Sequence, residues 1–209
     1  MTYDYHDQEM DEAYDRLSDE LYPAHKAQAI IEFTYERLRS YYLQHKDLLL
    51  PAGRTYKTAE TLLQKQQFAA SLVFSASAIE LFLKACLLRP VVAGLIHSES
   101  MADLFVESTL SQTGFKRYDK LLAGLFKELT QMELREVKRP EVSRSLLEEA
   151  SALQEKRNAV VHRGAEISEV EAIEAFAISQ AVFNQVLSVV LNELGLSLKK
   201  GGELADGEA

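Results

Sequence analysis

Hydrophobic residues recur at intervals of three and four positions along most of this chain, which is the spacing of one face of an α-helix. The spacing predicts a helix from about Pro23 to Leu50, ended by the turn Pro51-Ala52-Gly53. A longer helix is predicted from about Thr58 to Leu88, stopped by Pro90. Its second half is apolar nearly all round, so we expect a central helix that is contacted on several sides.

The C-terminal half carries clear start and stop signals for two further helices. Pro140 fits the first turn of a helix that runs to Arg163, with Gly164 as its C-terminal stop. Ser168 and Glu171 have the spacing of a capping box, which predicts the start of another apolar helix. This last helix is expected to end near residue 195.

The pattern is weaker from Val91 to Lys138, where we expect an insertion with short helices at Met101–Leu110 and Tyr118–Met132. Strand-like alternation of convincing length is not found. The fold class is therefore predicted to be all-α, a bundle of four to five main helices with short inserted helices before the penultimate long one. The expected organisation is an acidic N-terminal arm at 1–22, one helical domain at 23–198 and a flexible acidic tail at 199–209.

Composition narrows the class of protein. A chain of 209 residues with 47% apolar and 26% charged residues can bury one good core and is not generally disordered. The net charge of −9 argues against a broad, non-specific nucleic-acid surface, although it leaves room for a small local site. The acidic beginning lacks an apolar signal segment, and the lone Cys86 lies in an apolar run, so we expect a cytoplasmic protein.

The segment Phe68–Leu88 is long and apolar enough to span a membrane, but it contains Glu80 and Lys84. An ionised group at mid-membrane costs at least about 2.5–3.5 kcal/mol, so we expect a buried core helix and no membrane. The two residues stand four apart, the spacing of a helical ion pair. A buried pair of this kind rarely stabilises a protein relative to apolar residues, which indicates a specific supporting task.

Several familiar kinds of site are excluded by the motifs. The five histidines show no metal-binding spacing, the glycines form no phosphate-binding loop, and no GxSxG nucleophile elbow is present. We therefore expect neither a metal ion nor a cofactor.

The remaining chemical signal is Arg157-Asn158 followed by His162. Asn158 and His162 are four residues apart and so share one face of a helix. The helix C-terminus favours a charged His162 while Arg157 opposes it, and the sequence leaves the balance open. An arginine that neutralises phosphate and a histidine that transfers protons suit the cleavage of RNA, whose 2′-hydroxyl is an internal nucleophile. The plain alternative is a surface cation and a histidine that interacts with the helix dipole.

At these residues the chain resembles a known superfamily. The helix with SAIELFLKACLL and the later helix ending in EKRNAVVHRG are similar to HEPN (higher eukaryotes and prokaryotes nucleotide-binding) proteins, whose signature is an arginine, usually a polar residue, and a histidine four to six positions beyond the arginine. The resemblance implies a helical bundle that dimerises and brings two motifs into a shared cleft. It implies that Arg157 and His162 are catalytic, that Asn158 orients or binds the phosphate, and that Glu80 and Lys84 are supporting residues.

Many members of that superfamily are metal-independent ribonucleases that act as toxins or in phage defence. We therefore expect a homodimeric RNA endonuclease that leaves a 2′,3′-cyclic phosphate, with RNA as substrate and an antitoxin or a defence-system protein as a further partner. Lys156, Arg163 and Arg144 are expected to bind RNA, and Lys138 and Arg139 to extend this basic rim. Two alternatives stay open, a non-catalytic interaction module and a module that binds nucleotides without hydrolysing them.

Overall fold

The computed structural model describes residues 35–90 and 119–207. The chain divides into two compact units, Met1–Arg37 and Leu38–Ala209, and all but three of the described residues belong to the second unit. The predicted arm boundary after residue 22 and the predicted short helix at 101–110 lie outside the described residues.

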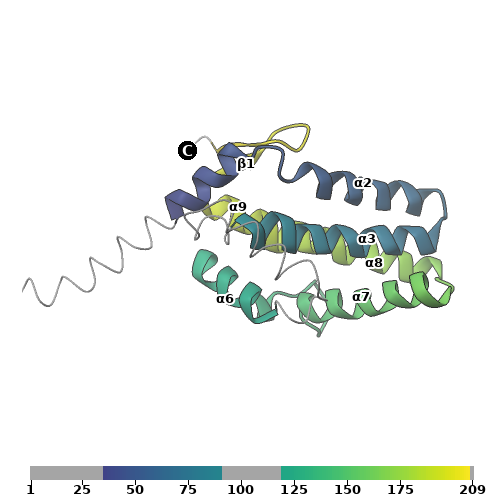
Figure 1. The fold of residues 1–209 in the computed structure, drawn as a ribbon. Coiled ribbons are helices and arrows are strands. Elements are labelled where there is room, and N and C mark those ends of the chain that lie inside the picture. Colours follow the sequence, from purple (N-terminus) through teal and green to yellow (C-terminus); the bar gives the residue numbers. More distant parts are fainter. Residues whose placement is uncertain (1–34, 91–118, 208–209) are drawn as a thin grey trace, which may run out of the picture. The chain divides into compact units, whose positions relative to one another are not determined.

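The described part is mostly helical, with one small two-stranded sheet, which agrees with the predicted all-α class. Residues 35–44 are helical, and six further segments form the rest of the helical structure (Figure 1). These are α2 (Leu50–Gln64), α3 (Phe68–Leu83) continued by the π-helical turn η1 (Lys84–Leu88), α6 (Asp119–Thr130), the 3₁₀ turn η3 (Leu134–Glu136), α7 (Leu146–Arg163), and α8 (Glu169–Val182) continued by the π-helical turn η4 (Phe183–Leu187) and by α9 (Ser188–Glu193).

The prediction of one long helix from Thr58 to Leu88 is wrong, because the chain reverses direction between Gln64 and Phe68. α2 ends at Gln64, and Gln66 takes a left-handed backbone conformation with a φ of 58° before α3 begins at Phe68. Residues 64–67 are exposed and polar, so nothing apolar has to be buried across this break. The apolar periodicity continues on both sides because α2 and α3 pack against each other as a helical hairpin.

Pro51 and Pro140 also differ from their predicted roles. Pro51 begins α2 instead of ending the preceding helix, since a proline in the first turn loses no helical hydrogen bond. Pro140 precedes α7, whose N-cap is Ser145. The Ser145 hydroxyl and the Glu148 side chain form a capping box there. The predicted end of α7 is confirmed by Gly164, which has a φ of 64°.

The predicted capping box at the start of α8 is confirmed, since Ser168 is the N-cap and Glu171 accepts from its backbone N–H. The predicted flexible tail from residue 199 is wrong for most of its length. Leu196–Leu198 (β1) pairs antiparallel with Leu204–Asp206 (β2), and Leu196 and Leu204 are both buried. Alternating leucines followed by Gly201-Gly202 were the hairpin signal in the sequence.

The core lies around α3 and α8, which run between α2 on one side and α7 on the other (Figure 1). Two helical segments, Phe68–Leu88 and Glu169–Glu193, are long and apolar enough to cross a membrane by composition alone. Both segments contribute fully buried residues to the core, among them Leu72, Phe82, Leu87 and Val190. Ser71 and Ser75 are also buried in α3, and the hydroxyl of Ser71 donates to the carbonyl of Ala59 in α2.

Candidate functional site

The last two turns of α7 carry all three residues of the predicted catalytic motif. Arg157 Nη1 donates a hydrogen bond to Asn158 Oδ1 at 3.0 Å. Arg157 is partly buried, whereas Asn158 and His162 are exposed. The structure thus brings the cation and the amide into contact, and it places the imidazole one turn further along the face that carries Asn158.

Lys156, next to the motif, forms an ion pair between the end of α7 and the start of α8. Lys156 Nζ donates to Glu171 Oε1 at 3.0 Å. This bond and those from Ser168 lower the pKa of the Glu171 carboxyl to about 2. Lys156 was predicted to bind RNA, and in the structure it is paired with a carboxylate of its own chain, although its side chain remains 46% exposed.

The predicted basic rim is only partly formed. Arg139 is directed inward, where Nε and Nη2 donate to the carboxylate of Glu149 at 2.9 and 2.5 Å, and this bond raises the pKa of the arginine. Because Glu149 is buried, Arg139 serves as the counter-ion of an internal charge and is not a rim residue. Arg144 lies with Lys156 beside a small cavity of about 90 Å³ that acidic residues of α7 and α8 also line. Arg163 is exposed at the end of α7.

Glu80 and Lys84 form the predicted ion pair, with Nζ and Oε1 2.5 Å apart. The pair lies at the C-terminal end of α3, where η1 begins. The turn from α2 to α3 and the turn from α7 to α8 are both at the opposite end of the unit (Figure 1). His162 lies in the last turn of α7, at that opposite end. The supporting role of Glu80 and Lys84 stays a prediction.

Three large apolar side chains, one in the motif segment and two near the start of α8, are exposed, which the sequence pattern did not indicate. Val161 is 51% exposed, and Val170 and Ile173, one turn apart on α8, are 74% and 50% exposed. Helix periodicity alone did not reveal these positions, because apolar residues surround the axis of α8 on most sides. Large apolar side chains that are exposed to solvent can mark a contact with another molecule.

The described residues also bear on metal binding and on cysteine chemistry. They contain no group of three or more side chains with metal-ligand chemistry. Burial raises the pKa of the Cys86 thiol to about 12, so this residue does not supply a thiolate nucleophile. Comparison with known proteins adds nothing to this site, since no protein-family model matches the chain and no similar curated protein or solved structure was found.

Proposed function

We propose that this protein is a metal-independent RNA endonuclease that works as a homodimer of the HEPN type, in toxin–antitoxin or phage-defence biology. The observation that carries the proposal is the joint placement of Arg157, Asn158 and His162 at one exposed helix end. An arginine, an amide and an imidazole within two helical turns supply charge neutralisation, orientation and proton transfer for a phosphodiester.

In the proposed reaction the ribose 2′-oxygen attacks the phosphorus and the bond from phosphorus to the 5′-oxygen breaks. One histidine accepts the 2′-hydroxyl proton and a second gives a proton to the leaving oxygen, so that a 2′,3′-cyclic phosphate and a 5′-hydroxyl form. Arg157 neutralises the charge that builds on the phosphate oxygens. Asn158 holds the guanidinium through the bond to its side-chain oxygen.

A second copy of the chain is needed for two reasons. One motif provides a single histidine, whereas this reaction uses two proton-transfer groups. In one copy His162 and Asn158 are also open to solvent, where electrostatic stabilisation is weak. A two-fold contact through the exposed apolar residues Val161, Val170 and Ile173 would bring two motifs together and exclude water from the space between them.

Cleavage of single-stranded RNA by the purified chain in the presence of EDTA tests this function. We expect cleavage that resists EDTA, a 2′,3′-cyclic phosphate at the new end, and a loss of at least a hundredfold in His162→Ala. His45→Ala removes another exposed histidine of the described region and should retain activity. Full activity in His162→Ala, or cleavage only with added metal, would contradict the proposal.

The exposed apolar residues also fit a second function, that of a non-catalytic interaction module. This alternative predicts that RNA remains intact under all conditions. It also predicts that Val170→Asp abolishes capture of a partner protein while Arg157→Ala leaves capture unchanged. The RNA assay above therefore separates the two functions directly.

A further inference from the structure

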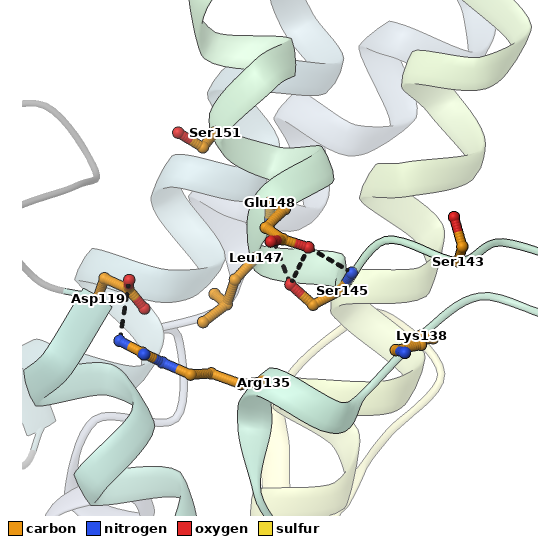
Figure 2. Close-up of a pocket in the computed structure, with 8 residues that line it drawn as sticks. All are labelled: Asp119, Arg135, Lys138, Ser143, Ser145, Leu147, Glu148 and Ser151. Atoms are coloured by element: carbon orange, nitrogen blue, oxygen red, sulfur yellow. Dashed lines mark hydrogen bonds and ion pairs between the residues drawn. The ribbon is translucent and has the colours of Figure 1, made fainter.

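Two of the cavities that described residues line differ in how their charged side chains are paired. In the cavity of about 430 Å³ between α6 and the first turns of α7, Arg135 donates to Asp119 (Figure 2). Glu148 accepts from Ser145 in the same cavity, so charges of both signs are bonded within it and select no particular ligand. A larger cavity, of about 950 Å³, is lined by residues 49–65, by one residue each of α3 and η4, and by the C-terminal hairpin. We call this second cavity the α2 groove.

The floor of the α2 groove is apolar and contains aromatic rings. Tyr56 of α2, Phe82 of α3 and Phe183 of η4 all line it. The ring centroids of Phe82 and Phe183 are 5.3 Å apart, and those of Tyr56 and Phe183 are 6.5 Å apart. Phe82 is buried, whereas Tyr56, Phe183 and Leu198 of the hairpin keep part of their surface open to solvent. Because the rings pack on one another, this floor is formed before any ligand binds.

The two π-helical turns of the described residues adjoin this floor. η4 begins at Phe183, and η1 begins two residues after Phe82. π-helical turns are rare, and they occur often at functional sites because the extra residue in the turn changes the direction of the side chains around it. Their position on two neighbouring helices of the groove is an observation independent of the cavity itself.

The exposed wall of the α2 groove is positively charged. Arg54, Lys57 and Lys65 line it and are exposed, and Glu203 is the one acidic residue among its described lining residues. Glu60 is also on α2 but does not line the groove. None of the three cations forms an ion pair with a residue that the structure describes. In a chain with a net charge of −9, this wall is a local reversal of charge and favours an acidic partner.

The spacing of the cations indicates an elongated ligand. Arg54 and Lys57 are three residues apart, and Lys65 lies eight residues beyond Lys57, which is about 12 Å along the helix axis. A single-chain lipid has one anionic head and would leave one end of this wall unmatched. Small ligands also prefer enclosed pockets, whereas the wall of this groove is exposed along its length. An amphipathic helix fits better, since its apolar face covers a groove and its flanking carboxylates recur every three or four residues.

We propose that the α2 groove binds an acidic amphipathic helix of a partner protein. The apolar face of that helix contacts the aromatic floor, and its carboxylates pair with the three cations of the wall. No described lining residue of the groove belongs to α7, so the inference does not depend on the proposed nuclease function.

Binding of synthetic peptides to the full chain tests the proposal. The probe is a fluorescein-labelled peptide of about 18 residues, or about 27 Å as a helix, with leucines on one face and glutamates beside them. One control peptide has lysine in place of every glutamate, and another has the same composition in shuffled order. Fluorescence anisotropy should show at least tenfold tighter binding of the acidic peptide than of either control. Unspecific attraction to this acidic chain would favour the lysine peptide instead.

Variants of the groove locate the binding. Arg54→Glu combined with Lys57→Glu should weaken binding of the acidic peptide at least tenfold, because two attractions become repulsions. Lys120→Glu combined with Lys138→Glu makes the same change of net charge at exposed positions outside the groove and should bind like the wild type. Leu198→Glu should weaken binding about tenfold by placing a carboxylate beside the aromatic floor. Cooperative thermal unfolding confirms that each variant is folded.

Several outcomes would overturn the proposal. They are equal binding of the three peptides, binding of none of them to the wild type, equal losses in the groove variants and in the Lys120/Lys138 control, and full binding in both groove variants. A change of sedimentation from dimer to monomer in the groove variants, without peptide binding to the wild type, would assign the groove to a second copy of the chain instead. RNA cleavage has no part in these measurements, so either proposal can fail while the other stands.

Discussion

Arg157 donates a hydrogen bond to the side chain of its immediate neighbour, Asn158, at 3.0 Å. Consecutive residues of a helix point in different directions, so the arginine side chain has to bend around the helix to make this bond. The bond draws the guanidinium toward the face that carries Asn158 and His162. Asn158 is therefore interpreted as the residue that positions the cation.

This relationship predicts an order of effects at position 158. Asn158→Ala should slow RNA cleavage about tenfold, because Arg157 remains but is no longer held. Asn158→Asp should slow it by at least a hundredfold, because a carboxylate would neutralise the guanidinium and repel the phosphate. Single-turnover cleavage rates measure both effects, with Asn192→Ala as an exposed control on α9. A faster reaction in Asn158→Asp than in Asn158→Ala would show that Asn158 does not act through Arg157.

The exposed apolar residues of α8 predict where the proposed dimer contact lies. Val170 is 74% exposed, and Val170→Asp would place a charge in the proposed dimer contact. We expect this variant to sediment as a monomer and to lose cleavage, because each site would then lack its second histidine. Leu121→Asp changes a residue on α6 that is 48% exposed and should remain dimeric. A wild-type chain that cuts RNA as a monomer would remove the need for this surface.

Glu171 predicts a specific dependence of stability on pH. Its pKa in the folded protein is about 2, below the ordinary value of 4.5, because it accepts hydrogen bonds from Lys156 and Ser168. A lowered pKa stabilises the fold above about pH 4.5, and this contribution is lost as the pH falls toward 2. Since the pair is exposed, the effect should be small, about 0.5 kcal/mol.

Urea unfolding of wild type and Glu171→Gln at several pH values measures this effect. The difference in the free energy of unfolding should be largest at pH 6 and should shrink toward pH 2. Glutamine can still cap the backbone of Ser168, so the comparison isolates the charge. Glu166→Gln, an exposed residue of the loop before α8, is the control. A difference that does not change with pH would mean that the ionised carboxylate contributes nothing.

The C-terminal hairpin predicts a contrast between two leucines. Leu204 is 1% exposed, and Leu204→Ala should lower the free energy of unfolding by about 2–4 kcal/mol. Leu198 is 37% exposed, so Leu198→Ala should cost less than about 1 kcal/mol. Thermal or urea unfolding of the full chain measures both variants. Equal, small effects would indicate that β2 does not pack on the helical core.

Local signals in the sequence were reliable where the physics is local. The capping box at Ser168 and Glu171 and the Gly164 stop were identified correctly, because a cap depends on residues within one helical turn. The spacing of Arg157, Asn158 and His162 likewise placed them near the end of one helix. The break at Gln66 was missed, because apolar periodicity is the same in one long helix and in two helices that pack against each other.

What the sequence determined by itself was the helical class, most helix ends in the second half of the chain and the presence of one arginine–asparagine–histidine group. Tertiary structure decided which charges are available to a ligand. Arg139 pairs with the buried Glu149, and Lys156 forms an ion pair with Glu171 of the next helix. Asp119 and Arg135 are 16 residues apart in the sequence, but they lie together in one cavity. The reason is physical: the partner of a charged side chain depends on how helices pack, and helix packing is a non-local property that spacing along one helix does not contain.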